Sequence, residues 1–363
     1  MYFHPIVAGD LDAIVDADLS WDALRGRTVL VTGVNGMIAG YLVLALLRAN
    51  DRLGLGLRVV ALARNAAKAR DRYADVIDRP DLVLHAQDLA DPLELDEPVH
   101  LIVHAASQTG PSQFTGDPVG TIDSNVLGTR NLLQWAVDHG AAQFLFLSTR
   151  EIYGAPVGDA RFAAEDDYGP VDPTSVRSCY PESKRLGEAY CVAFRHQFGL
   201  DARIARIAHT YGPGMVVGDG RVVGDFLAKT VAGENIEMIS DGSGQLALTY
   251  IADVIAGLLR LVLDTDLVVA NISQDAELVS VRALAEQLTA LSANPDARAV
   301  FAEASEQVKA GYLARPPAFL DSARMRAAGW SATVPMAAGL ARVLAFLREP
   351  LASTAAVDPA LRR

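Results

Sequence analysis

Short apolar runs separated by helical stretches most restrict the fold of this chain. Five runs rich in Val, Leu and Ile have the length of buried strands: RTVLVTG, LRVVALA, DLVLHAQ, HLIVHAA and FLFLST. Residues 37–50, 121–139 and 179–198 have the length and apolar spacing of helices. Apolar strands that alternate with helices are typical of a parallel sheet covered on both faces. The sequence therefore predicts a doubly wound, Rossmann-like α/β fold.

The change of pattern along the chain predicts a second, smaller lobe after this sheet. A further strand, ARIARIA, is followed by a segment dense in Gly and Pro, where the strict alternation fades. We expect an N-terminal helical extension in which Trp21 and Leu24 pack on the main body, and a lobe from which one strand near 246–252 can return to the sheet. The tail is expected to be flexible. The regions are 1–26 (extension), 27–208 (Rossmann domain), 209–350 (substrate-binding lobe) and 351–363 (tail).

Charge and cysteine content narrow the class of protein. The formal net charge of the 363 residues is −12, which argues against binding to nucleic acid or to an anionic membrane. Cys179 and Cys191 lie twelve positions apart in one predicted helix, so we expect neither a disulfide nor a metal site. The N-terminus lacks a signal-peptide pattern and no apolar run approaches about 18 residues. We expect a cytoplasmic protein.

A glycine-rich turn joins the first strand to a helix. It contains Gly33, Asn35, Gly36, Met37 and Ile38. Glycines at this place allow a tight turn and let the backbone approach a pyrophosphate, which the N-terminus of the following helix then binds. The turn predicts a dinucleotide site.

The end of the second strand bears on the choice of dinucleotide. An acidic residue there binds the ribose 2′-hydroxyl of NAD, whereas an arginine accommodates the 2′-phosphate of NADP. The sequence has Arg64 and Asn65, with Lys68 following, and no acid. Arg64 either binds a phosphate or stacks beside the adenine, so NADP stays open beside NAD.

Tyr180 and Lys184 lie four positions apart in a predicted helix and therefore on one face of it. An ammonium beside a phenol lowers the pKa of the phenol and makes it a general base for a hydroxyl group. The alternative is an exposed helix with an extended lysine.

Several motifs together resemble the extended short-chain dehydrogenase/reductase family of nucleotide-sugar epimerases, dehydratases and decarboxylases, over residues 27–345. They are TGVNGMIAG, Asp88-Leu89, HAAS at 104–107, Asn125 in SNVLGT, STREIYG at 148–154, Tyr180 with Lys184, and TYGPG at 210–214. The resemblance implies an NAD site lined by Asp88, Leu89, Ala105, Ala106, Ser107, Asn125, Tyr180 and Lys184. It also implies that Tyr180 takes a proton from the sugar 4-hydroxyl while hydride leaves C4, with Thr149 bonded to the same oxygen.

The residues after Thr149 bear on the fate of the 4-ketone. Dehydratases of the family carry Thr-Asp-Glu, whereas this chain has Thr149-Arg150-Glu151. A guanidinium does not donate a proton at neutral pH, which disfavours a 4,6-dehydratase. Glu151 is either a base at C5 or an ordinary acid paired with Arg150.

Two further segments, DYGPVDPTSVRSCYPESKR and GDGRVVGDF, resemble UDP-glucuronate decarboxylases, and Arg315 matches an arginine that those enzymes keep near the substrate. Against this, they carry Thr-Ser-Glu where Arg150 stands, and an arginine in place of Leu246. Arg221 or Arg150 could compensate at the substrate. His209 replaces an asparagine and is either structural or a substrate contact.

We therefore expect an NAD-dependent nucleotide-sugar epimerase that works through a 4-keto sugar, with UDP-glucuronate decarboxylase as the alternative. A 4,6-dehydratase or a non-catalytic dinucleotide-binding protein is less expected. Helices 121–139 and 179–198 carry apolar residues on more than one face, and related enzymes pair such helices in a dimer. We expect a homodimer; the alternative is burial of those residues, Leu132, Leu133, Trp135 and Val137, within one chain.

Overall fold

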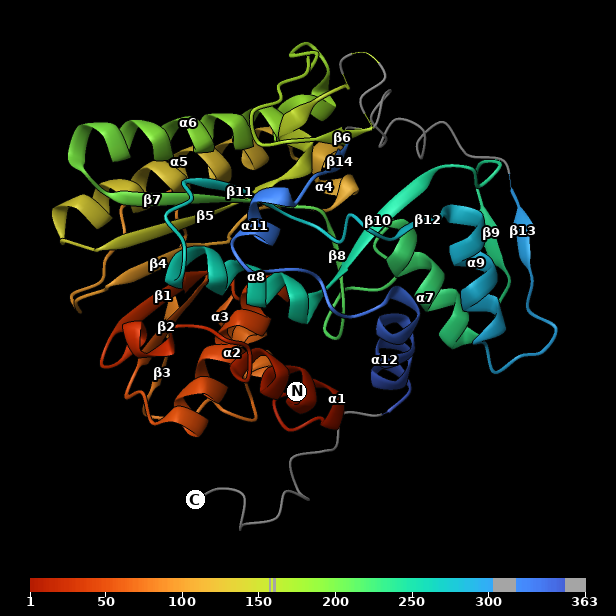
Figure 1. Cartoon of the computed structure of the whole chain (residues 1–363), viewed down its shortest axis with the longest axis horizontal. Coiled ribbons are helices and arrows are strands. Elements are labelled where there is room, and N and C mark those ends of the chain that lie inside the picture. The colour runs from red at the N-terminus through yellow and green to blue at the C-terminus, as the bar shows by residue number, and fades with distance from the viewer. Residues whose placement is uncertain (157, 159–160, 303–317, 350–363) are drawn as a thin grey trace.

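A seven-stranded parallel sheet forms the centre of the protein (Figure 1). The computed structural model describes residues 1–156, 158, 161–302 and 318–349. The strand order in the sheet is β11-β7-β5-β4-β1-β2-β3. The strands are β1 Thr28–Thr32, β2 Arg58–Ala63, β3 Leu82–Ala86, β4 Leu101–His104, β5 Gln143–Thr149, β7 Asp201–Ile207 and β11 Val269–Ile272. The six predicted strands all lie in this sheet, which confirms the predicted fold class.

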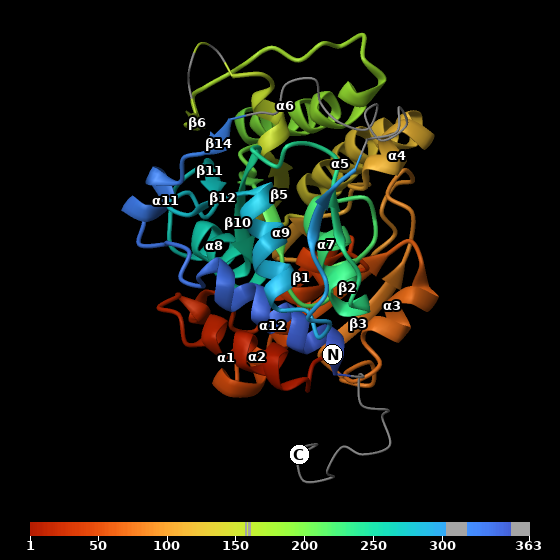
Figure 2. The ribbon, with the colours of Figure 1, turned by 90° about the vertical axis from the view of Figure 1, so that its right-hand side faces the viewer.

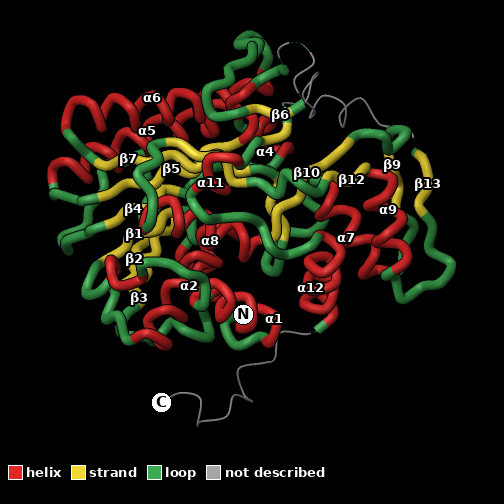
Figure 3. The backbone as a smooth tube through the Cα atoms, viewed as in Figure 1, coloured by secondary structure: helices red, strands yellow, loops and turns green. Residues whose placement is uncertain are grey.

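Helices cover both faces of the sheet, as Figure 3 shows in red around the yellow strands. The α-helices are α1 Pro5–Val15, α2 Met37–Leu53, α3 Ala66–Arg72, α4 Pro111–Gly116, α5 Pro118–Asp138, α6 Cys179–Phe198, α7 Val222–Ala232, α8 Ile251–Leu263, α9 Val281–Ala290, α11 Ala323–Ala327 and α12 Met336–Arg348. The 3₁₀ turns are η1 Trp21–Leu24, η2 Arg150–Tyr153 and η3 Val176–Ser178.

The two faces of each central strand belong to different apolar clusters. In β1, Val29 and Val31 pack in the cluster that contains α2 and α8, whereas Leu30 packs in the one that contains α5 and α6. Successive side chains of a strand point to opposite faces. Because both of its faces are buried, β1 has apolar residues at consecutive positions rather than at alternate ones.

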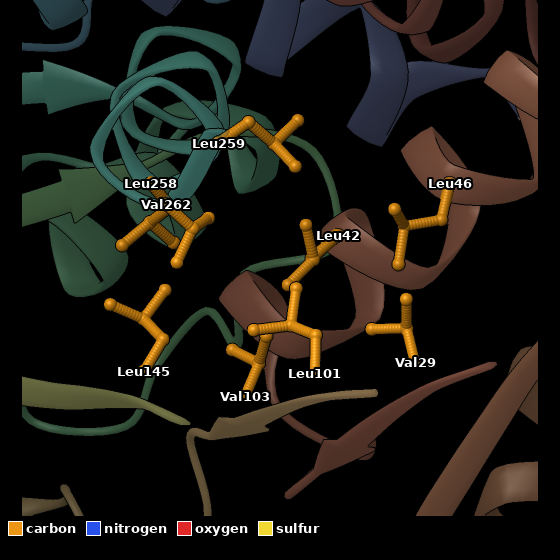
Figure 4. A pocket seen from close by; sticks show the side chains of 9 residues that line it. All are labelled: Val29, Leu42, Leu46, Leu101, Val103, Leu145, Leu258, Leu259 and Val262. Atoms are coloured by element: carbon orange, nitrogen blue, oxygen red, sulfur yellow. The ribbon is translucent and has the colours of Figure 1, made fainter. Parts of the chain in front are cut away.

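The packing under α2 and α8 leaves one small gap, shown in Figure 4. Leu42 and Leu46 of α2 and Leu258, Leu259 and Val262 of α8 line it, above Val29, Leu101, Val103 and Leu145 of the sheet. Its volume is about 10 Å³ and its lining is apolar. A gap of this size and polarity is a dry packing void and holds no substrate.

Among the described residues, three small sheets lie outside the central sheet, and Figure 2 looks onto helices α7, α9 and α12 of the second lobe. Its main sheet has the order β12-β10-β8. The strands are β8 His209–Tyr211, β10 Gln245–Tyr250 and β12 Leu278–Ser280; the pairs are β9 Ile236–Met238 with β13 Ala299–Phe301, and β6 Phe162–Ala163 with β14 Phe319–Leu320.

The strand near 246–252 does not return to the central sheet, so that expectation was wrong. The chain leaves β7 at Ile207 and forms β8 from His209, and β10 pairs in parallel with this continuation. The strand that does join the central sheet is β11, beside β7. The exact boundary between the two lobes stays a prediction.

The N-terminal extension packs on the main body through α1, which contacts helices α2 and α8. Trp21 and Leu24 are buried, as expected. The carboxylate of Asp10 accepts hydrogen bonds from Tyr41 (2.7 Å), Tyr250 (2.6 Å) and Arg342 (2.9 Å). This buried cluster joins α1 to α2, β10 and α12, and so ties the extension to both lobes.

The apolar residues that suggested a dimer are not on the surface. Leu132, Leu133 and Trp135 are buried within the chain, and Val137 is half-buried against the same cluster. Cys179 and Cys191 are both free thiols in α6, in agreement with the prediction of no disulfide. Within the described ranges, the helices are too short or too polar to cross a membrane.

Candidate active site

The predicted glycine turn lies at the point where the strand order of the sheet reverses. β1 pairs with β4 on one side and β2 on the other, and the connections after β1 and β4 diverge. Ligands of doubly wound sheets bind at this point. The Thr32 hydroxyl accepts hydrogen bonds from the backbone N–H groups of Ala105 (3.2 Å) and Ala106 (3.1 Å), which holds the two loops together.

Gly33 has to be glycine for two independent reasons. Its φ is +72°, in the left-handed region, and a Cβ atom would lie 2.6 Å from the Cα of Ala106. No other side chain allows this close approach. Gly33 therefore lets the glycine turn pack directly against the loop that carries Ala105 and Ala106.

The first turn of α2 is left open for an anion. Gly36 is its N-cap and provides no side-chain hydrogen bond, so the N–H groups that begin with Met37 and Ile38 are not capped by a side chain. Such groups bind phosphate. Asn35 donates to the carbonyl of Asn65 (2.9 Å), while its Oδ1 is buried without a partner among the described residues. These residues fit a dinucleotide.

Residues predicted for the cofactor site after β2 and after β3 come together. Nη1 of Arg64, after β2, lies 3.7 Å from Oδ2 of Asp88, after β3. Asn65 caps α3 by accepting from the N–H of Lys68 (2.9 Å), and Leu89 is buried. Arg64 and Asp88 are both largely exposed, so the pair is weak and both remain available to a ligand.

A chain of buried hydrogen bonds connects the glycine turn with the helix of Tyr180. His104 bonds Thr32 through Nδ1 (2.9 Å) and Thr129 through Nε2 (3.0 Å). Burial, and then the charge of Lys184, lower the pKa of His104 to about 3, so the ring is neutral. One turn before Thr129 in α5, Asn125 donates to the hydroxyl of Ser183 in α6 (2.9 Å). His104 stood in the motif HAAS, but nothing in the sequence indicated its partners.

Tyr180 is buried in the first turn of α6 and stacks on Phe114, with ring centroids 4.7 Å apart. Its pKa is raised, mainly by burial and then by the charge of Glu151. A hydrogen bond with Thr149 and the charges of Arg177 and Arg221 lower it. The prediction that the pKa of this phenol is lowered overall was therefore wrong, because burial outweighs the nearby positive charges.

Lys184 lies on the same helix, and its ammonium is fixed by contacts with β5. Its ammonium donates to the carbonyl of Leu147 (2.9 Å) and stands 4.6 Å from the centroid of the Phe146 ring. Burial lowers its pKa to about 8. Tyr180 and Lys184 thus share one helix face, as predicted, and both are buried rather than exposed.

Glu151 pairs with Arg177, and not with Arg150, the partner that one of the two interpretations of the sequence gave it. Nη2 of Arg177 lies 2.8 Å from Oε1 of Glu151, and both side chains are largely buried. The guanidinium of Arg177 also lies over Phe114, 4.3 Å from the ring centroid. The second oxygen of Glu151 is buried without a partner among the described residues. Arg177 opens the same RSCYPESKR stretch as Tyr180, and its role was missed because the pair bridges η2 and η3.

Positive charge gathers around this pair. Desolvation, and then the charges of Arg150 and Arg221, lower the pKa of His209, although the residue as a whole is exposed. Arg221 is exposed and pairs with Asp219 through Nε (2.8 Å). Of the three predicted substrate contacts, Arg150 and Arg221 are each near enough to His209 for their charges to act on it. Arg315 lies outside the described residues.

A buried polar network fixes the backbone of η2, which carries Arg150 and Glu151. Arg206 of β7 bonds Glu188 of α6 (2.8 Å) and the hydroxyl of Tyr153 (2.8 Å). Tyr153 in turn donates to Asn271 of β11 (2.7 Å). These bonds tie η2, through Tyr153, to β7 and β11, and through Arg206 to α6.

The chain belongs to the NAD-dependent epimerase/dehydratase family. The model of that family matches residues 29–272. The predicted NAD cofactor and the predicted enzyme class are thereby confirmed, as is the resemblance.

Individual relatives differ in the reaction that they are named for. The chain is similar to UDP-glucuronic acid decarboxylase 6 of Arabidopsis thaliana, with 35% identity over 72% of this chain and 74% of the relative. The structure of dTDP-glucose 4,6-dehydratase from Streptomyces venezuelae, with NAD bound, has a TM-score of 0.74 at 26% identity, covering 88% of this chain and 97% of that one. UDP-glucuronic acid 4-epimerase from Bacillus cereus has a TM-score of 0.73 at 20% identity, covering 88% and 99%. The last likeness supports the fold alone.

Proposed function

We propose that this enzyme inverts C4 of a nucleotide sugar through a transient 4-ketone. The observation that carries the proposal is the arrangement at Tyr180: a buried phenol stacked on Phe114 in the first turn of α6, on the same helix face as the buried Lys184. NAD, when bound, accepts the hydride of C4 and carries a positive charge into the site.

Each residue then has a defined task. Tyr180 takes the proton of the 4-hydroxyl at its phenol oxygen and later returns it. Thr149 holds the same sugar oxygen. Lys184, whose ammonium donates to the carbonyl of Leu147, binds the ribose of the cofactor. The free oxygen of Glu151 accepts a hydrogen bond from the sugar ring or takes a proton beside the ketone, because Arg177 holds its other oxygen.

UDP-glucuronate decarboxylase is the second candidate function. The similar relatives support it at least as well as they support the epimerase. The Arabidopsis relative and seven others are named for this reaction. What weighs against it is Leu246, which packs half-buried on the main apolar cluster and cannot bind a phosphate as an arginine does. Arg150 is the second departure.

The test is to incubate the enzyme with NAD and with UDP-glucose, UDP-galactose or UDP-glucuronate, and to identify products by mass spectrometry and NMR. An epimerase gives a product of unchanged mass with inverted C4, and Tyr180→Phe lowers the rate by about 100-fold or more. A product lighter by one carbon dioxide would establish the decarboxylase instead. A dehydrated product would refute both.

We propose in addition that two chains pair through the outer face of α5 and α6. Val119, Ile122 and Leu127 of α5 and Leu186 and Val192 of α6 are all more than 40% exposed. These differ from the residues that first suggested a dimer. Light scattering on wild type and on Val192→Lys tests the pairing: a dimer that becomes a monomer in the variant supports it, and a wild-type monomer at micromolar concentration removes it.

A further inference from the structure

The phenol ring of Tyr180 packs on one other aromatic ring. Among the described residues, the buried apolar cluster that contains Tyr180 has two other members, Phe114 and Cys179. It is separate from the large clusters on the two faces of the sheet. Phe114 is 3% exposed and stacks on the Tyr180 ring, with the centroids 4.7 Å apart and the ring planes inclined by 26°. Within that cluster, Phe114 is therefore the ring that supports the phenol.

The same Phe114 ring also contacts the partner of Glu151. The Cζ atom of Arg177 lies 4.3 Å from the centroid of the Phe114 ring. Nη2 of Arg177 lies 2.8 Å from Oε1 of Glu151, whereas Nε and Nη1 are buried without a partner among the described residues. A guanidinium is attracted to the face of an aromatic ring, and more strongly where both are shielded from water. Phe114 and Glu151 together therefore hold Arg177 in place.

The loop after β4 places Phe114 against the start of α6. Gly110 is the N-cap of α4, and its backbone N–H donates to the side chain of Gln113 (3.1 Å). Sγ of Cys179 donates to the backbone carbonyl of Phe114 (3.6 Å). Because Cys179 comes directly before Tyr180, this weak hydrogen bond ties the backbone that carries Phe114 to the backbone that carries the phenol.

We propose that Phe114 is a positioning residue for the reaction, whose ring holds the phenol of Tyr180 and the Arg177–Glu151 pair in one arrangement. The proposal rests on the proposed function, because it takes Tyr180 to be the group that accepts the proton of the sugar 4-hydroxyl. In this role Phe114 acts through Tyr180 and Arg177, and touches neither the sugar nor the cofactor.

The stacking matters for proton transfer because the phenol oxygen lies at the far end of the ring. A turn about the Cα–Cβ bond of Tyr180 swings this oxygen, and the ring of Phe114 blocks the turn on one side. A general base has to lie within hydrogen-bond reach of the proton that it removes. A misplacement of about 1 Å can cost about 100-fold in rate. Loss of the Phe114 ring should therefore lower the rate of the chemical step.

Steady-state kinetics of Phe114→Leu, with the nucleotide sugar that the wild type converts, test the proposal. The kcat should fall by about 10- to 100-fold, while KM and the Kd of NAD stay within about 3-fold, because the ring contacts protein groups alone. Phe114→Tyr keeps the aromatic ring and should retain most of the wild-type kcat.

Phe194→Leu is the matched control. Phe194 also lies in α6 and is buried, with 8% of its surface exposed, but it belongs to the large apolar cluster that contains α5. Its substitution removes a buried aromatic ring away from Tyr180, so kcat should stay within about 3-fold of the wild type.

Three kinetic results would overturn the proposal. One is a kcat of Phe114→Leu within about 3-fold of the wild type. Another is a higher KM with unchanged kcat, because Phe114 would then bind the sugar itself. The third is an equal loss of kcat in Phe194→Leu, because lost stability would then explain both variants.

Crystal structures of the NAD-loaded wild type and of NAD-loaded Phe114→Leu separate this proposal from the proposed function. If the wild type converts no nucleotide sugar, the proposed function fails. The positioning role of Phe114 then stands if Tyr180 and Arg177 change their orientation in Phe114→Leu. It is refuted if both side chains keep the wild-type orientation.

Discussion

The buried pair of Arg177 and Glu151 can be tested by substitution at either side. Arg177→Met removes the guanidinium and keeps an apolar chain against Phe114. Breaking a buried pair from one side costs about 3 to 5 kcal/mol. We expect about 3 kcal/mol, the lower end, because Glu151 keeps 19% of its side chain in solvent. Urea denaturation measures the loss.

The double variant separates the pair from other effects of each substitution. Glu151→Gln removes the carboxylate that Arg177→Met leaves uncompensated, so the double variant should be more stable than the sum of the single losses by about 1 to 3 kcal/mol. Losses that add to within about 0.5 kcal/mol would refute the pairing.

The pH dependence of kcat/KM reports on the protonation of Tyr180, which unfolding experiments do not measure. Activity requires the phenol to accept a proton, so the rate falls as the pH drops below the pKa of Tyr180. Glu151 raises that pKa and Arg177 lowers it. Arg177→Met should therefore move the acidic limb of kcat/KM to higher pH, and Glu151→Gln to lower pH. Shifts of the same sign in both variants would contradict these roles.

Three further predictions concern the cofactor turn and the core. Gly33→Ala should weaken the binding of NAD by at least about 10-fold, as measured by fluorescence titration. Gly140→Ala is the control: Gly140 has a similar φ of +70° but free space for a Cβ atom, so its substitution should leave NAD binding unchanged. His104 has an ordinary pKa of 6.5 and a folded pKa of about 3, so below pH 6.5 the unfolded chain binds the proton and stability falls. Between pH 6.5 and 5 the free energy of unfolding should fall by about 2 kcal/mol because of His104. In urea denaturation, His104→Gln should show a smaller fall over the same pH range. Leu145→Ala, beside the apolar void, should cost about 3 to 5 kcal/mol in urea; a loss under about 1 kcal/mol would show that the site collapses.

Local patterns in the sequence predicted the central sheet and the dinucleotide turn. Runs such as RTVLVTG are apolar because both of their faces are buried, and the turn after them is glycine-rich because of a contact with the next loop. Such features are determined by residues that are close in sequence or by burial that every position shares. The spacing of Tyr180 and Lys184 is of the same kind.

Contacts between distant segments could not be predicted in the same way. Arg177 reaches Glu151 across 26 positions because η2 and η3 lie side by side in the fold. The pKa of Tyr180 depends on burial by Phe114, a residue of α4 that no motif marks. The position of β10 depends on the departure of the chain from β7. Each of these is decided by tertiary packing, which overrides local pattern.

Inversion at C4 can be tested most directly with UDP-glucuronate labelled with deuterium at C4. Hydride that leaves C4 and returns to the other face gives a product of unchanged mass, with inverted C4 and deuterium still attached to it. The proposed mechanism predicts this product, and predicts its absence in Tyr180→Phe. A product that has lost carbon dioxide, or one whose C4 deuterium has exchanged with solvent, would contradict it.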